Sequence, residues 1–308
     1  MKKFRKNNLI IIFLILLLTL FIINSELVIK SILSYTNLFM EKLFPASFIF
    51  FIISSLLIDY NFIEKISKLL HINGSIFYVV VMSMLSGFPS GSKYITDLLE
   101  RELISTKVAN YLIIFTHFPN PIFVLGSVSS IFKDKTIPVF ILISLIISNL
   151  LIGVFLYPKD KEKFKIIKSE STNFSINLKK AIYGSIKTMI LIYGTSVFFY
   201  LIITILNNYL NLSLYNYIFV NGLFDLTKGV FLTSLINNEI LRAIYIIIFI
   251  SFGGISINMQ VKSIIADTNI KYKNFILGRF FQIILSMSIF LLLLGINWWC
   301  YVNRIFCS

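Results

Sequence analysis

Residues 137–157 read IPVFILISLIISNLLIGVFLY and carry no charged side chain. A helix of about 20 such residues is long enough to cross the hydrocarbon core of a bilayer. Residues 181–206 and 273–298 are at least as long and nearly as apolar. We therefore predict an all-α fold, a polytopic bundle of membrane helices.

The composition of the whole chain supports the same fold class. Of its 308 residues, 57% are hydrophobic and only 14% are charged, whereas a soluble domain carries about 25% charged residues. The net charge of +14 comes from Lys and Arg residues that lie mainly between the apolar segments. Basic loops of this kind favour the cytoplasmic side of the membrane and contact with anionic headgroups. We expect the lipid bilayer as a partner and no nucleic acid.

Few residues in the sequence suit metal binding or catalysis. The two cysteines, Cys300 and Cys307, and the two histidines, His71 and His117, form no metal-binding pattern. No nucleotide-binding P-loop is present in the sequence. Asp225 is the only acidic residue well inside an apolar segment, and neither histidine has a convincing serine partner. We expect no catalytic residue, no metal and no cofactor, and therefore no enzyme.

Apolar segments and one basic stretch divide the chain. The apolar segments are 9–23, 43–58, 76–86, 108–132, 137–157, 181–206, 214–236, 241–257 and 273–298. The basic stretch follows the fifth of them, and the positive-inside rule places it in the cytoplasm. We expect four parts: an N-terminal membrane helix with an interfacial segment (1–42), a first half (43–157), the basic cytoplasmic linker (158–180) and a second half (181–308).

The N-terminus has four basic residues among its first six, followed by the apolar residues 9–23. This pattern resembles a signal peptide. No small-residue cleavage site follows, so we expect an uncleaved first helix with a cytoplasmic N-terminus. If the linker is cytoplasmic as well, an even number of helices must cross the membrane between the two. Residues 76–103 must then enter the membrane and return on the same side as a re-entrant hairpin.

The two halves resemble each other in the order of their segments. SGFPSGSKYITDLL from Ser86 and FGGISINMQVKSII from Phe252 each follow a short apolar segment and precede a long one. Their glycines Gly87 and Gly253 are 166 residues apart. Interrupted hydrophobic segments at corresponding positions of two halves point to the binding site of a transporter. We predict two similar halves, each with a re-entrant or broken-helix hairpin, and leave open whether they are inverted.

The first motif is GFPSGSK, from Gly87 to Lys93. Pro89 blocks a regular helix, and the glycines allow close approach of the backbone. A half-helix that begins at Ser90 would point its N–H groups into a cavity, where Lys93 would add positive charge. A GxxxG packing patch is the structural alternative. We expect a substrate-binding turn formed by Gly87, Pro89, Ser90, Gly91, Ser92 and Lys93.

The second motif lies inside segment 108–132, where Pro119 and Pro121 flank Asn120. A break in the helix there would place the Asn120 amide at membrane depth, inside the substrate cavity. The alternative is a proline kink that only shapes the packing.

The third motif, Asp225-Leu226-Thr227-Lys228-Gly229, lies inside segment 214–236. Charged side chains within a membrane segment are costly and usually functional. On a helix, Asp225 and Lys228 would share one face. We expect Asp225, Thr227 and Lys228 to bind substrate; an exposed loop with an ordinary solvated ion pair is the alternative.

The fourth motif is GGISINMQ from Gly253. Ser256, Asn258 and Gln260 would offer neutral hydrogen bonds, and Arg279 would add a cation. For Arg279 the alternative is snorkelling towards the membrane interface. We expect all four to belong to the substrate site.

At these motifs the chain resembles the YlbJ/SpoVV family of sporulation integral membrane proteins, which belongs to the nucleoside-recognition or gate-domain proteins related to concentrative nucleoside transporters. The matching stretches are 43–48, SGFPSGSK from Ser86, Asn120-Pro121 with Phe123 and Gly126, 225–229, and SFGGISINMQVKSIIADT from Ser251. The family pattern has alanine where this chain has Ser92 and glutamate where it has Asp225.

The resemblance implies transport of dipicolinic acid, a planar dianion, across the outer forespore membrane during sporulation. We expect this multi-pass chain in the bacterial inner membrane and, in sporulating cells, in the outer forespore membrane. A nucleoside or another metabolite is the alternative solute. A non-transporting membrane partner in spore-envelope assembly is the alternative role. Homo-oligomers and complexes with other sporulation membrane proteins remain open, as do the driving force and the direction of transport.

Overall fold

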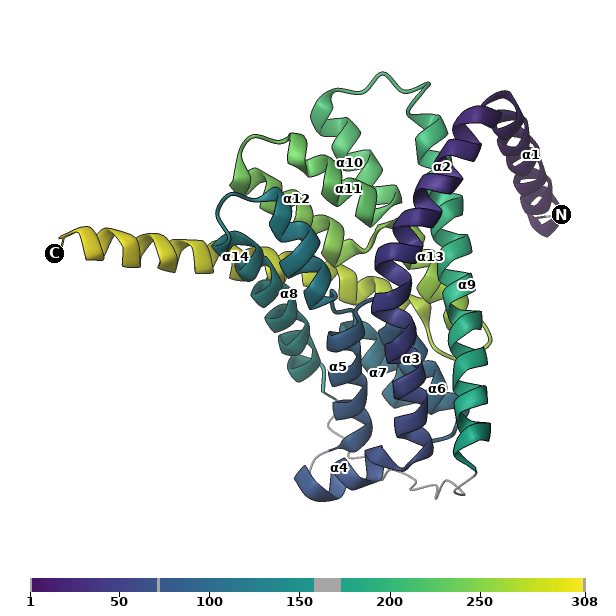
Figure 1. Ribbon diagram of the computed structural model, residues 1–308, viewed down its shortest axis with the longest axis vertical. Helices are drawn as coiled ribbons and strands as arrows, with labels where there is room; N and C mark the ends of the chain where they lie inside the picture. Colours follow the sequence, from purple (N-terminus) through teal and green to yellow (C-terminus); the bar gives the residue numbers. More distant parts are fainter. Residues whose placement is uncertain (1, 71–72, 158–172, 307–308) are drawn as a thin grey trace.

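The computed structural model describes residues 2–70, 73–157 and 173–306, and every regular element within these ranges is a helix (Figure 1). The predicted all-α bundle of membrane helices is confirmed. Four described spans are long and apolar enough to cross a membrane, and two bent helix pairs raise this number to six. The four spans are α8 (Thr136–Phe155), α9 (Phe174–Leu206), α12 with α13 (Glu239–Ile264) and the larger part of α14 (Tyr272–Phe306).

The expected linker lies largely outside the described residues. The structure leaves out 158–172, and α9 begins at Phe174. The last residues of the expected linker therefore belong to a helix. The amide side chain of Asn173 caps that helix by accepting a hydrogen bond from the N–H of Ser175 at 3.0 Å.

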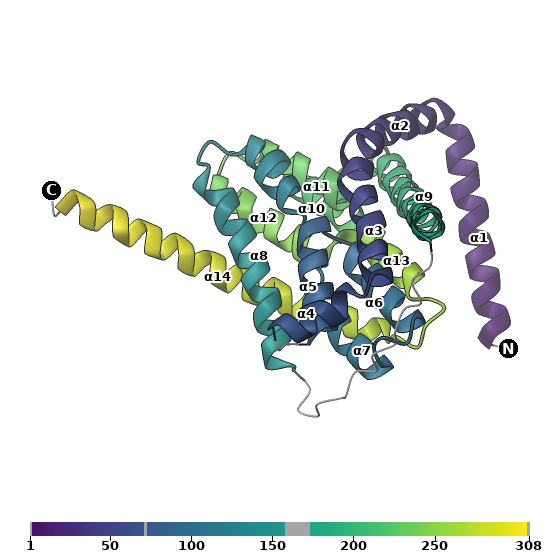
Figure 2. The same cartoon turned by 60° about the horizontal axis from the view of Figure 1, so that its bottom comes forward.

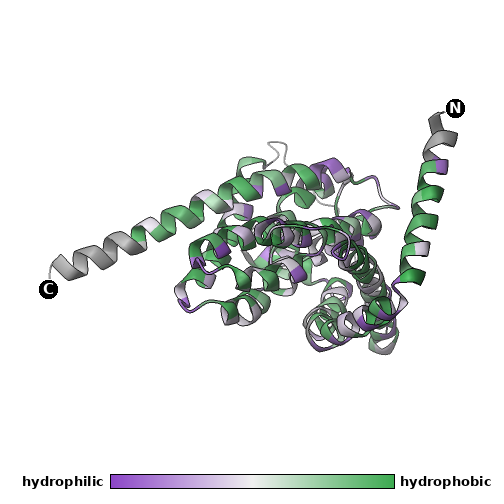
Figure 3. Cartoon of the chain, turned by 90° about the horizontal axis from the view of Figure 1, so that it is seen from above, coloured by the Kyte–Doolittle hydropathy of each residue, from purple (hydrophilic) through white to green (hydrophobic). Residues whose placement is uncertain are grey.

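The first two helices form a bent pair. α1 (Lys2–Ile23) and α2 (Ser25–Leu38) meet at a bend of 93°. α1 stands apart from the bundle (Figures 2 and 3). Most of its apolar side chains from Leu9 to Ile23 are exposed. Lipid is the natural solvent for such a surface. α2 leads through a π-helical turn, η1 (Phe39–Leu43), into α3 (Phe44–Asp59), and both α2 and α3 pack against α9.

A helical hairpin forms where the sequence predicts one. The short α4 (Phe62–Leu70) precedes it, and α5 (Gly74–Ser86) and α6 (Ser90–Glu100) pack against each other. Gly87 ends α5 with a φ of 76°, which glycine adopts without strain. A Cβ atom at Gly87 would lie 2.7 Å from the Cβ of Asn120. The tip of this hairpin therefore lies against Asn120.

The second hairpin is not at Gly253, where the comparison of motifs placed it. It consists of α10 (Leu214–Phe224) and α11 (Leu226–Leu232), with Asp225 at its tip and a single 3-10 turn, η4 (Thr233–Leu235), after it. A Cβ atom at Gly229 would collide with the backbone of Gly222, so the two helices touch through glycines. Gly253 instead interrupts α12 (Glu239–Phe252) and α13 (Gly254–Ile264), which together form one span.

Each half has the same order of elements: a hairpin, a broken helix and a straight helix. In the first half the broken helix is α7 (Thr106–Phe115), which is non-helical from Thr116 to Asn120 and continues through η2 (Phe123–Val128) and η3 (Ser129–Ile131). The hairpin tips, Gly87 and Asp225, are 138 residues apart, and α8 and α14 begin 136 residues apart. The repeat therefore pairs Gly87 with Asp225, and its spacing is shorter than the 166 residues expected from Gly253.

The two hairpins approach the centre of the molecule from opposite ends. In Figure 1, α5 and α6 lie in the lower part of the bundle and α10 and α11 in the upper part. Residues next to both tips line one central cavity. The hairpins of the two halves are therefore inverted relative to each other.

Candidate functional site

The central cavity has a volume of about 340 Å³. One wall consists of helices α2, α3 and α9 with the turn η1, and the opposite wall consists of the two hairpin tips and the two helix breaks. The cavity therefore lies where the chain is least regular. Non-helical backbone at membrane depth occurs where protein buries it or where it lines a water-filled space.

The tip of the first hairpin contributes Ser86, Phe88 and Pro89 to the cavity. Behind it, Ser86 Oγ lies 2.6 Å from Ser90 Oγ and accepts a hydrogen bond from Tyr94 OH at 2.9 Å. These buried hydroxyl groups fix the turn between α5 and α6. Ser90 thus supports the tip and is not itself part of the cavity lining.

Asn120 joins this tip to the break after α7. Its Nδ2 donates to the carbonyl of Ser86 at 3.4 Å, and its Oδ1 accepts from the N–H of Ile122 at 2.8 Å. The break has a second support, because Asn149 of α8 donates from Nδ2 to the carbonyl of His117 at 2.8 Å. The predicted Asn120 therefore lines the cavity and holds two backbone segments together.

The tip of the second hairpin contributes Asp225, Leu226 and Thr227. Asp225 is only 2% exposed, and its Oδ1 caps α11 by accepting from the N–H of Lys228 at 2.9 Å. Gly254 approaches closely, since a Cβ atom there would lie 3.1 Å from the N atom of Leu226. The tip thus lies against the break between α12 and α13, as the first tip lies against Asn120.

Helix α13 contributes Ser256 and Gln260 to the lining. The Nε2 of Gln260 donates to Ser196 Oγ of α9 at 2.6 Å, which links the two walls. The third predicted residue of this helix, Asn258, does not line the cavity. Its Nδ2 donates to the carbonyls of Phe252 and Gly254, and its Oδ1 accepts from Tyr272 OH, so it stabilises the helix break.

The three predicted cations do not belong to the cavity lining. Lys93 forms an ion pair with Asp97 one turn along α6. Lys228 donates to Thr204 Oγ1 at 2.9 Å and lies over the ring of Tyr200. The positive charges of Lys93 and Lys228 therefore contact other protein groups and are not part of the lining around a bound anion.

Arg279 is 1% exposed and contacts both halves. Its Nη2 donates to the carbonyl of Ile114 at 2.9 Å, and its Nη1 lies 3.5 Å from the carbonyl of Ser251. Ile114 and Ser251 lie in the last turns of α7 and α12, where carbonyl groups lack partners within the helix. A cation at a helix C-terminus is also electrostatically favourable. Arg279 is buried among helix ends, so it does not snorkel.

Two other predicted residues form backbone contacts instead of lining the cavity. Ser92 donates to the carbonyl of Pro89 at 2.6 Å. A Cβ atom at Gly91 would collide with the carbonyl oxygen of Thr116, so α6 and the break after α7 pack closely there. Of the predicted site residues, the cavity is lined by Pro89, Asn120, Asp225, Thr227, Ser256 and Gln260.

Polar groups of the opposite wall were not predicted. They include Tyr35 of α2, Ser47 of α3 and Ser196 of α9. Ser47 lies within the stretch 43–48 that carries part of the family resemblance, which was a usable signal. Tyr35 and Ser196 lie in helices without breaks and have no comparable signal in the sequence.

The chain is similar to the protein described as "Sporulation integral membrane protein YlbJ" from Bacillus subtilis (strain 168). The two are 25% identical over 311 aligned positions, which cover 84% of this chain and 75% of the relative. No family model matches the chain. No solved structure matches it significantly. The resemblance predicted from the motifs is confirmed at the level of this relative.

Proposed function

We propose that this homologue of a sporulation integral membrane protein is a transporter that carries a small polar solute through its central cavity. The observation that carries the proposal is the cavity between two inverted hairpin tips and two helix breaks. Discontinuous helices that surround a central site are typical of secondary transporters. The volume of about 340 Å³ is within the range of about 300–1,000 Å³ found for ligand pockets.

Dipicolinate is the solute that we propose first. The name of the relative supports a role in sporulation, and the outer forespore membrane is the corresponding location, with the N-terminus in the mother-cell cytoplasm. The helices α6 and α13 both begin beside cavity-lining residues, and the positive ends of helix dipoles favour anions. Phe88 and Phe123 offer apolar surface for a planar ring.

A nucleoside or another uncharged metabolite is the second candidate. Among the described residues that line the cavity there is no lysine or arginine, whereas the carboxylates of Glu41 and Asp225 are present. This acidic lining supports a neutral or hydroxyl-rich solute, whereas the sporulation relative and the helix N-termini support dipicolinate. Asn120 and Gln260 supply the amide groups that such a solute could contact.

Uptake into proteoliposomes tests the proposal. The purified full-length chain is reconstituted, and labelled dipicolinate and labelled uridine are offered separately, with protein-free liposomes as the control. Saturable dipicolinate uptake that unlabelled dipicolinate inhibits, and uridine does not, is the expected result. Saturable uridine uptake alone would assign the second candidate. Uptake of neither solute, with and without proton or sodium gradients, would favour the non-transporting role in spore-envelope assembly.

A further inference from the structure

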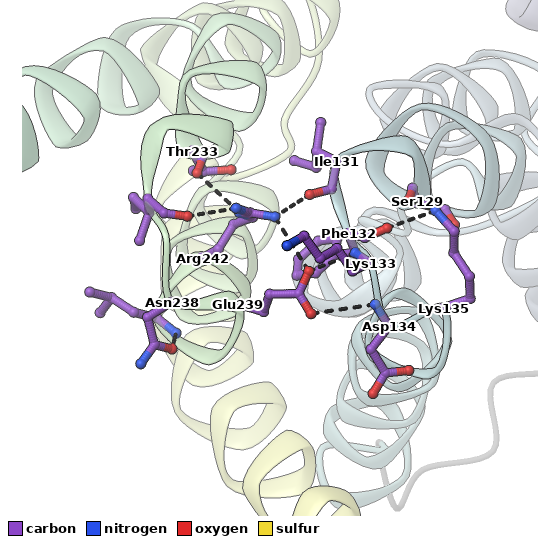
Figure 4. Close-up of polar contacts among 12 residues, drawn as sticks. Ser129, Ile131, Phe132, Lys133, Asp134, Lys135, Thr233, Asn238, Glu239 and Arg242 are labelled. Carbon is purple, nitrogen blue, oxygen red and sulfur yellow. Dashed lines mark hydrogen bonds and ion pairs between the residues drawn. The ribbon is translucent and has the colours of Figure 1, made fainter.

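Arg242 connects the two halves of the molecule at one end of the bundle (Figure 4). Its side chain is buried, with 8% of the residue exposed. It donates to the carbonyls of Ile236 at 2.6 Å, of Thr233 at 3.2 Å, and of Ile131. Thr233 and Ile236 belong to the end of the second hairpin, whereas Ile131 ends η3 in the first half. The guanidinium of Arg242 therefore binds backbone carbonyl groups of both halves.

Glu239, one turn before Arg242 on α12, makes the complementary contacts (Figure 4). Its two carboxylate oxygens accept from the N–H groups of Lys133 at 2.6 Å and Asp134 at 3.4 Å, and Oε1 lies 3.7 Å from Arg242 Nη1. The guanidinium also lies 5.4 Å from the centre of the Phe132 ring. The start of α12 thus binds the last carbonyl group of η3 and two N–H groups of the loop that follows it.

The two segments that meet at Arg242 begin at the cavity. η2 carries Phe123 and Ser127 in the cavity lining and continues into η3. α11 carries Thr227 in the lining and continues into η4. The two continuous helical segments, 121–131 and 226–235, are shorter than the roughly 12 to 15 residues at which an isolated helix becomes marginally stable in water. Their positions therefore depend on what anchors their two ends.

We propose that Arg242 and Glu239 are positioning residues for the solute site, and that they set the width of the cavity by holding the outer ends of η3 and η4 together. At the cavity, the segment that ends in η3 begins at the helix break, and the segment that ends in η4 begins at the tip of the second hairpin. The outer ends are fixed by hydrogen bonds that involve charged groups, which are stronger than those between neutral groups. The inference rests on the proposed function, because it assigns these residues to the solute site of a transporter.

Spin labels at Ser130 and Asn237 test the connection without any solute. Both residues are exposed, Ser130 within η3 and Asn237 between η4 and α12. In the full-length chain, Cys300 and Cys307 are replaced by serine, and the distance between the labels is measured by double electron–electron resonance. We expect a narrow distribution for the parent and a broader, longer one for Arg242→Met. Arg242→Lys keeps the charge but loses the fork of donors, so we expect an intermediate distribution.

Lys135→Met is the matched control. Lys135 Nζ also donates to carbonyls at this end, those of Ser129 and Phe132, but both lie in its own half. We expect its distance distribution and uptake kinetics to match the parent. In proteoliposomes we expect Arg242→Met and Glu239→Gln to raise the KM of the transported solute by about tenfold, with a smaller change in the maximal rate, the scale expected when one charge-assisted hydrogen bond is lost.

The two measurements separate the outcomes. An unchanged distance distribution in folded Arg242→Met, or the same broadening in Lys135→Met, would overturn the positioning role. A changed distribution with an unchanged KM would overturn its link to the solute site. If the parent carries neither dipicolinate nor uridine, the proposed function fails, and the distance measurement alone decides whether Arg242 joins the two halves.

Discussion

Gly229 lies directly on the backbone of Gly222, so helices α10 and α11 have no room for a side chain between them. Small residues at helix contacts in membranes allow the backbones to approach this closely. The contact lies within one turn of Asp225, the tip of the second hairpin. The position of the buried carboxylate therefore depends on two glycines.

Gly229→Val is expected to force α10 and α11 apart. Overpacking of this kind destabilises by about 1–3 kcal/mol, and the midpoint of thermal unfolding in detergent should fall. Gly184→Val on α9 is the control, because no atom lies within 4 Å of a Cβ at that position. Equal midpoints for the two variants would contradict the close contact.

Asn149→Leu is expected to destabilise the break after α7. The change removes the donor that the carbonyl of His117 accepts at 2.8 Å, and a buried group left without a partner costs about 1–3 kcal/mol. Thermal unfolding or denaturant titration in detergent measures the loss. Ser148→Ala is the neighbouring control, since the Ser148 hydroxyl donates only to the carbonyl of Leu145 in its own helix. If Ser148→Ala were as destabilising, the bond to the helix break would not be the cause.

Asp225→Asn separates the charge of Asp225 from its structural role. Asparagine is also a good N-cap, so α11 keeps a partner for the N–H of Lys228. We expect normal expression and stability but an uptake rate lowered by about tenfold or more, since charge buried in a membrane site is usually functional. Asp134→Asn is the control, because Asp134 is exposed and is not among the residues that line the cavity. Uptake equal to the parent would remove the carboxylate from the mechanism.

Lys93→Ala tests whether this lysine acts on the solute or on Asp97. The two side chains form an ion pair within α6, so the single change leaves the Asp97 carboxylate without that partner. We expect reduced uptake for Lys93→Ala and recovery towards the parent in Lys93→Ala with Asp97→Ala. The double-mutant cycle gives the coupling between the two residues, about 1 kcal/mol for such a pair. A double variant as inactive as the single one would return Lys93 to the solute site.

The helices were predictable because apolar length alone specifies them in a membrane. The stretch 137–157 gave α8 almost to the residue, and the parity argument predicted the hairpin of α5 and α6. The second hairpin was misplaced because the motifs at Gly87 and Gly253 follow similar segments in the sequence, and in the structure both glycines adopt a positive φ. That property permits a hairpin turn and also a break within one span. The choice between the two depends on packing, such as the contact of Gly222 with Gly229.

The sequence was sufficient to predict cavity-lining residues at the hairpin tips and helix breaks, but not to predict which charged side chains belong to the lining. Asn120, Asp225 and Gln260 were identified because polar groups within apolar segments are conspicuous in a sequence. Lys93 and Arg279 were assigned to the same site on that ground, yet each has partners elsewhere. Those partners are Asp97 on the same helix and the carbonyl of Ile114, 165 residues away. The second contact cannot be inferred without the tertiary structure.

The shared position of Arg279 has a consequence for how the protein unfolds. Its guanidinium holds the end of α7 through Ile114 and lies against the end of α12 at Ser251, and Gly278 packs on the same Ile114 carbonyl. The end of α7 in the first half therefore depends on an arginine of the second half. We therefore expect the two halves to unfold as one cooperative unit, because loss of the first half would expose the buried cation of Arg279 in the second.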